Sequence, residues 1–184
     1  MTKLLAKLSN WKLIIPALLA FIYCLYLFQK AEAQMSELAG VHTPMIDTRN
    51  GYDLPEIQEF FTSIKPEGRA IHKFATGVVD MIFPWVYGSL FILVAAFFLK
   101  KLSNSKSKWI YLSLFPILLM IVDYKENVNT LNLLENYPNL TAEMVDSASK
   151  VTVLKSILTQ ISIVLPLVLG IVWLIMWGRN KFNR

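Results

Sequence analysis

Four runs of apolar residues divide the sequence, and each predicts a membrane-spanning helix. The runs are Leu13–Phe28, Met81–Leu99, Trp109–Val122 and Ile157–Trp177. A helix needs about 20 residues to cross about 30 Å of hydrocarbon, so the first and third runs need their flanking residues to span. We expect spans over about 11–29, 81–100, 109–126 and 155–177. The pattern therefore predicts an all-α, antiparallel four-helix transmembrane bundle, forming one membrane domain over residues 1–184.

Two long polar connections, about 30–80 and 127–154, separate these runs, and the first contains a short amphipathic pattern. Asp53 is placed to cap a helix, and Ile57 and Phe60 follow it at helical spacing. We expect a short helix that lies on the outer membrane surface or caps the bundle. The alternative is that it packs only on neighbouring loop residues.

Three of the spanning helices are predicted to continue beyond the hydrocarbon. From Arg69 the pattern runs without a breaker into the second span. Residues Trp109 to Asn136 suit one helix of about 42 Å, which exceeds the bilayer core. Thr141 is placed to cap the last helix, which would enter the membrane near Leu154.

Charge then fixes the predicted orientation. The chain is 55% hydrophobic and 17% charged, which is typical of a membrane protein. Ten of the 18 cations stand at the two termini and in the connection between the second and third runs, while all 13 acids fall in residues 29–80 or 123–155. Because cations favour cytoplasmic ends, both termini are predicted to be cytoplasmic. The net charge of +5 reflects this anchoring and predicts no nucleic-acid partner.

The N-terminal segment also has a second interpretation. Basic residues, a 16-residue apolar stretch and small residues at Ala31–Ala33 resemble a secretory signal with its cleavage site. Cleavage would leave three spans and an external N-terminus. We expect an uncleaved first helix.

Polar residues on helices two and three form the candidate site. On helix two, Arg69, His72, Thr76, Asp80 and Tyr87 are spaced 3, 4, 4 and 7 and share one face. On helix three, Asp123, Glu126, Asn127 and Thr130 do the same. Since the helices are antiparallel, Asp80 and Asp123 are expected at similar depth near the outer interface. The predicted ligand-binding residues are Arg69, His72, Asp80, Tyr87, Asp123, Glu126 and Asn127.

Buried acids at a membrane edge need a counter-charge, hydration or protonation. We expect Arg69 to pair with Glu126 or Asn127, with Lys73 and Lys125 as the other candidate partners. Three interpretations remain open: a polar network that only fixes helix packing, a binding or catalytic site, and a solvated face.

Specific catalytic and metal-binding sites have less support in the sequence than a general binding site. Asp80 and Asp123 are candidate acid–base groups of a hydrolase, with His72 as a third catalytic candidate, but the GxGD context of intramembrane aspartyl proteases is absent. With two histidines and no HExxH motif, we expect no metal site, and we expect no cofactor. The single cysteine, Cys24, excludes an internal disulfide.

Several segments, read in order, resemble a family of small, uncharacterised four-span bacterial membrane proteins. They are the outer loop 47–52 (D-x-R-x-G-Y), Gly68-Arg69, the D-x-x-x-P-x-x-Y segment from Asp80 to Tyr87, and the D-x-x-E-N segment from Asp123 to Asn127. The resemblance implies a shared site at the outer rim and carries no activity with it. His72 departs from the aromatic hydroxyl expected at that position.

These features predict a binding protein rather than an enzyme. We expect a multi-pass protein of the bacterial inner membrane that binds a lipid, small ligand or partner at an extracytoplasmic polar cluster between helices two and three. The alternatives are a small hydrolase that uses Asp80 and Asp123, and an accessory subunit of a larger transporter. Expected partners are membrane lipids and either another membrane protein or a second copy of the chain.

Overall fold

The computed structural model describes residues 2–103 and 107–182, and within these ranges it is helical with no strand. The predicted all-α class is therefore confirmed. Two of the cations assigned to the cytoplasmic side, Lys106 and Arg184, lie outside the described residues.

Within the described ranges, three helices are long and apolar enough to cross a membrane: Trp11–Ala39, Lys65–Leu102 and Ala142–Lys181. They contain the first, second and fourth apolar runs. The third run is divided between a 3₁₀ helix, η3 (Lys108–Leu114), and the first half of α6 (Pro116–Asn136). The division has a local cause: Pro116 has no N–H to donate into a continuous helix and stands at the first position of α6, where that donor is not needed.

The chain folds into two compact units. The first comprises residues 1–21, 85–119 and 158–184, and the second comprises residues 22–84 and 120–157. Four helices contribute residues to both units: α2 (Trp11–Ala39), α5 (Asp80–Leu102), α6 and α7 (Ala142–Phe182).

The first unit is built from closely packed apolar helices. Gly170 of α7 lies so near α5 that an added Cβ would stand 3.2 Å from the ring of Phe98, and that ring also packs on Trp173. The short helix α1 (Thr2–Leu8) is tied to the end of α5, because Lys100 Nζ donates to the carbonyl of Ala6 at 3.1 Å. Many exposed side chains of α7 are apolar, and Leu167 is 60% exposed, which suits a helix that crosses a membrane.

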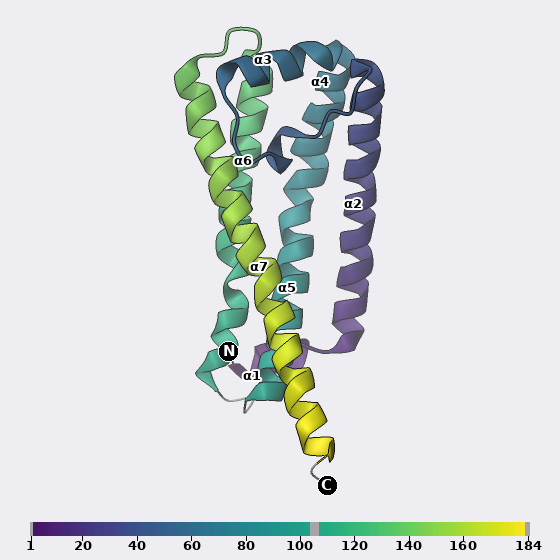
Figure 1. Cartoon of the computed structure of the whole chain (residues 1–184), viewed down its shortest axis with the longest axis vertical. Coiled ribbons are helices and arrows are strands. Elements are labelled where there is room, and N and C mark those ends of the chain that lie inside the picture. The colour runs from purple at the N-terminus through teal and green to yellow at the C-terminus, as the bar shows by residue number, and fades with distance from the viewer. Residues whose placement is uncertain (1, 104–106, 183–184) are drawn as a thin grey trace. The chain divides into compact units, whose positions relative to one another are not determined.

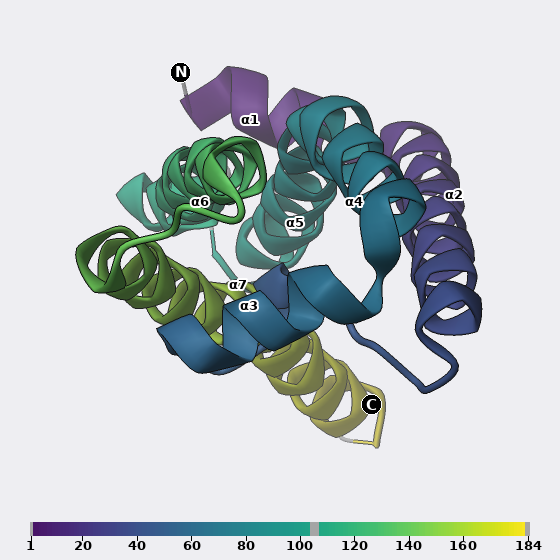
Figure 2. The same cartoon turned by 90° about the horizontal axis from the view of Figure 1, so that it is seen from above.

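The second unit has its core under α3 (Leu54–Ser63), which lies across the end of this unit from α7 to α4 (Figures 1 and 2). Asp53 caps α3 in a capping box with Glu56, as its position in the sequence predicts. Ile57 and Phe61 are fully buried in a cluster that also contains residues of α2, α6 and α7. The helix therefore packs on the bundle and not only on neighbouring loop residues.

The connection between α2 and α3 dips between the helices of the second unit and returns (Figure 1). Its lowest part is a 3₁₀ turn, η1 (Ile46–Thr48), anchored by Met45 and Ile46, which are 2% and 0% exposed. Gly51, at a φ of 99°, provides a left-handed turn on the way back. This path carries Asp47 from a polar loop into the interior.

Helix two starts well before its apolar run, as the sequence predicts. It begins as α4 (Lys65–Phe74), passes through a π-helical turn over Ala75–Val79 and continues as α5. A π turn holds about one extra residue. The π turn therefore shifts the spacing between Arg69 and Asp80 by about one residue, while His72, Thr76 and Asp80 all remain buried.

Candidate functional site: an acidic cluster around Lys155

Three carboxylates of the second unit contact one ammonium group, and a fourth lies beside them. Lys155 Nζ lies 2.6 Å from Glu126 Oε2, 3.3 Å from Asp123 Oδ1 and 3.4 Å from Asp47 Oδ2. The fourth carboxylate, Asp80, lies within 4.8 Å of its neighbours Asp47 and Glu126, measured between one oxygen of each. We call Asp47, Asp80, Asp123 and Glu126 the acidic cluster.

Each member comes from a local structure that places it. Asp47 is brought in by η1, and Asp80 follows directly on the π turn. Asp123 and Glu126 are three residues apart on α6 and therefore share a face. The acidic faces of helices two and three therefore lie close together in this unit.

The acidic cluster is buried. Glu126, Asp123 and Asp80 are 0%, 3% and 4% exposed, and the side chains of Asp47 and Lys155 are 19% and 12% exposed. With every carboxylate ionised, the cluster and Lys155 together carry a formal charge of −3. Such an excess is costly in a buried site unless protons or a bound cation neutralise it.

Asp80 differs from the other three acids in its contacts. Within the part of the chain that the structure describes, no hydrogen bond or ion pair reaches its carboxylate. Asn127 lies beside it, because the Asn127 Nδ2 donates to the backbone carbonyl of Asp80 at 2.8 Å. The Oδ1 atoms of Asn127 and Asp47 are also buried without a hydrogen-bond partner among the described residues.

Two hydroxyl groups lie near the carboxylate oxygen of Glu126 that does not contact Lys155. Thr152 of α7 donates to Glu126 Oε1 at 2.9 Å, and the phenol of Tyr52 lies 3.3 Å from the Thr152 hydroxyl. Burial raises the pKa of Tyr52 to about 12, and this effect exceeds the lowering by the hydrogen bond with Thr152. Tyr52 is therefore a neutral hydrogen-bonding group at physiological pH.

The cations expected to balance the acids lie elsewhere. Arg69 donates to the carbonyl of Phe61 at 2.6 Å and stacks over the ring of Tyr137, instead of pairing with Glu126 or Asn127. Lys73 forms an exposed pair with Glu135. The counter-charge comes from helix four.

The two remaining predicted site residues also have defined places. His72 is fully buried, with Nδ1 3.0 Å from the hydroxyl of Thr76 and its ring edge-on to Phe60. Tyr87 belongs to the first unit, where its ring packs on Phe91. A ligand-binding role for either residue stays a prediction.

Asp47 and Lys155 were missing from the predicted site. Asp47 stands in the D-x-R-x-G-Y segment, but no periodicity places a loop residue next to a helix face. The position of Lys155 does predict a buried ion pair. It follows Leu154, where the last helix is predicted to enter the membrane on the side that holds the acids. A cation at that depth is expected to find a buried acid.

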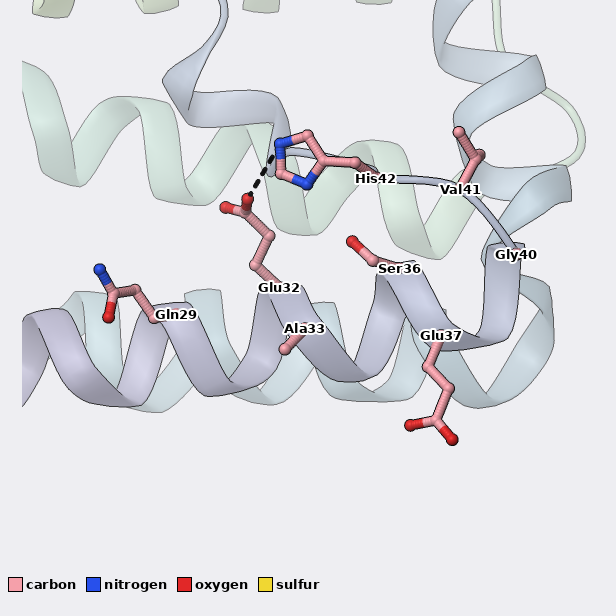
Figure 3. A pocket seen from close by; sticks show the side chains of 8 residues that line it. All are labelled: Gln29, Glu32, Ala33, Ser36, Glu37, Gly40, Val41 and His42. Atoms are coloured by element: carbon pink, nitrogen blue, oxygen red, sulfur yellow. Dashed lines mark ion pairs between the residues drawn. The ribbon is translucent and has the colours of Figure 1, made fainter.

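A separate pocket of about 620 Å³ lies between the end of α2 and the connection that follows it (Figure 3). Glu32 and His42 point toward each other across it at 3.7 Å, while Glu37 points away. The pocket is wide open and His42 is 77% exposed, so it lacks the convergent buried groups of the acidic cluster.

No protein-family model matches this chain, and no curated protein or solved structure matches it.

Proposed function

We propose that this chain is an integral membrane protein that binds a small ligand or lipid through a cationic group at the acidic cluster. The observation that carries the proposal is the buried excess of four carboxylates over one ammonium. A structure that needed only to join helices would be served by a neutral or balanced network. A site with surplus buried negative charge gains most from a positively charged guest.

The proposed topology has four spans in a bacterial inner membrane, with both termini cytoplasmic and the acidic cluster on the outer side. The contact of Lys100 with Ala6 supports it, because it brings the N-terminal segment to the same end as the basic connection after helix two. Besides the three long helices, this topology needs the third apolar run, Trp109–Val122, to cross the membrane through η3 and the start of α6.

Cysteine labelling tests this topology. In a Cys24→Ser background, a membrane-impermeant maleimide is expected to label Ser147→Cys in intact cells and Ser103→Cys only after lysis. Both residues stand outside the apolar runs. The reverse labelling pattern would overturn the orientation.

Thermal unfolding of the full chain in mild detergent with a chelator present tests the ligand proposal. Three probes separate the sources of positive charge: calcium chloride, spermidine, and phosphatidylethanolamine with phosphatidylglycerol as its lipid control. At least one probe is expected to raise the unfolding temperature of the wild type and to lose this effect in Asp80→Asn. Asp146→Asn, an exposed acid of α7 paired with Lys150, is the matched control. The proposal fails if no probe distinguishes wild type from Asp80→Asn.

A further inference from the structure

We propose that the acidic cluster is a calcium-class divalent cation site, coordinated by Asp47, Asp80 and Glu126 in competition with the ammonium of Lys155. This inference rests on the proposed function and names the chemistry of its ligand. It also replaces the sequence-based expectation of no metal site, which relied on the absence of histidine-rich motifs.

The donor set favours a hard cation. Ca²⁺ and Mg²⁺ bind carboxylate and carbonyl oxygens rather than imidazole or thiolate groups. One oxygen each from Asp47, Asp80 and Glu126 lies within 4.8 Å of the other two. Ca²⁺–oxygen distances of about 2.3–2.6 Å put opposite ligands about 4.6–5.2 Å apart, so these oxygens suit one Ca²⁺ with little movement. Mg²⁺ holds opposite ligands about 4.0–4.2 Å apart and requires nearly ideal octahedral geometry.

Asp80 is the observation that separates a binding site from a simple ion-pair network. Its carboxylate is 4% exposed, yet no hydrogen bond or ion pair reaches it within the described residues. Its oxygen nevertheless faces those of Asp47 and Glu126. A buried carboxylate in this position can serve as an oxygen ligand for a cation beside Asp47 and Glu126.

Asn127 offers a further oxygen beside Asp80. Its Oδ1 is buried and makes no hydrogen bond among the described residues. The bond from Asn127 Nδ2 to the Asp80 carbonyl holds that amide next to the site. With the three carboxylate oxygens it makes four protein ligands, and bidentate carboxylates and water can supply the rest of the six to eight that Ca²⁺ takes.

Lys155 acts as a tethered competitor for the same oxygens. Its ammonium contacts Glu126 and Asp47, two of the three carboxylates that would hold the ion. Asp123, which the ammonium also contacts at 3.3 Å, stays available to it when the ion takes the other two. The formal charge of the whole group then changes from −3 to −1.

The exposure of the group favours a bare ion over a bulky headgroup. Asp47 and Lys155 are the most exposed side chains of the group, at only 19% and 12%. A bare ion needs less room beside these buried carboxylates than a lipid amine does.

Calorimetric titration of the chelator-treated full chain with calcium chloride tests the inference. The wild type is expected to bind about one Ca²⁺ per chain, and Asp80→Asn to weaken binding by at least about tenfold because one anionic ligand is lost. Lys155→Met is expected to tighten binding because it removes the competing ammonium. Asp146→Asn is expected to bind as the wild type does.

The outcomes separate this inference from the proposed function. Absence of Ca²⁺ binding, or equal affinity in wild type and Asp80→Asn, overturns the calcium site. If spermidine or phosphatidylethanolamine still stabilises the wild type but not Asp80→Asn, the proposed function survives that result. Unchanged or weaker Ca²⁺ binding by a folded Lys155→Met overturns the competition. Asp80→Asn keeps the size and shape of the side chain, so the variant is expected to fold, and its unfolding temperature without added ion checks this.

Discussion

Lys155 Nζ lies 2.6 Å from Glu126 Oε2, and Glu126 is fully buried. This pair joins helix four to helix three within the second unit. It forms the shortest of the three contacts between the ammonium and the acidic cluster. Lys155 therefore supplies the positive charge that allows three neighbouring carboxylates to be buried together.

Replacing Lys155 by methionine is expected to destabilise the chelated protein by about 3–5 kcal/mol, because it leaves buried acids uncompensated. The matched control is Lys150→Met on the same helix, which removes a pair whose side chains are 74% and 62% exposed. That variant is expected to change stability by less than about 0.5 kcal/mol. Denaturant unfolding in detergent measures both. Equal effects would show that Lys155 does not balance the acidic cluster.

How far the sequence predicts this site depends on the type of element involved. Asp80, Asp123, Glu126 and Asn127 were predicted together because helical spacing and antiparallel spans determine which faces meet. The sequence does not place Asp47 in the cluster, because Asp47 lies in a loop. The path of that loop depends on the burial of Met45 and Ile46. No local pattern encodes such long-range packing.

The expected pairing of Arg69 is not formed, because its guanidinium donates to the carbonyl of Phe61 and lies over Tyr137. The helical spacing between Arg69 and Asp80 also crosses residues 75–79, where the structure has a π turn. No Gly-Pro pair or other familiar signal marks that turn. The predicted spans show the same limit: composition identified the apolar runs, while the 3₁₀ start of the third helix depends on Pro116 and its neighbours.

Asp53 offers a test of the cap that positions α3. Its side chain accepts from the amide of Glu56 at 2.9 Å, and its own amide donates back to Glu56 Oε2 at 2.8 Å. Asp53→Ala is expected to cost about 1 kcal/mol and to speed hydrogen exchange in the first turn of α3. Glu59→Ala, at an exposed position of the same helix, serves as the control and is expected to leave that exchange unchanged.

Two glycines of helix two are expected to respond in opposite directions to substitution by alanine. A Cβ at Gly68 would lie 2.7 Å from the Cβ of Ile64, which cannot move without displacing the chain around it. Gly68→Ala is therefore expected to destabilise the protein by about 1–3 kcal/mol. At Gly77 the nearest atom, of Leu131, would be 3.6 Å away, so Gly77→Ala is expected to be neutral or to stabilise by up to about 1 kcal/mol. Thermal unfolding of the two variants, measured side by side, tests both predictions. A Gly68→Ala variant as stable as the wild type would contradict the close approach of Gly68 to Ile64.

Tyr52 predicts a loss of stability at alkaline pH. Its pKa is raised to about 12 in the folded protein and is about 10 in an unfolded chain, so the folded state holds this proton more tightly. The associated stability is complete below pH 10 and declines as pH rises toward 12, because unfolding then releases the proton.

The measurement is the difference in unfolding free energy between wild type and Tyr52→Phe at several pH values. At pH 7 this difference contains only the contact of the phenol with Thr152 and its packing. Between pH 9 and pH 11 the wild type is expected to lose about 1 kcal/mol relative to Tyr52→Phe, since phenylalanine has no proton to release. The pH 7 value is the internal control for any packing change. A difference that stays constant up to pH 11 would mean that the Tyr52 hydroxyl is not buried beside Thr152 and Glu126.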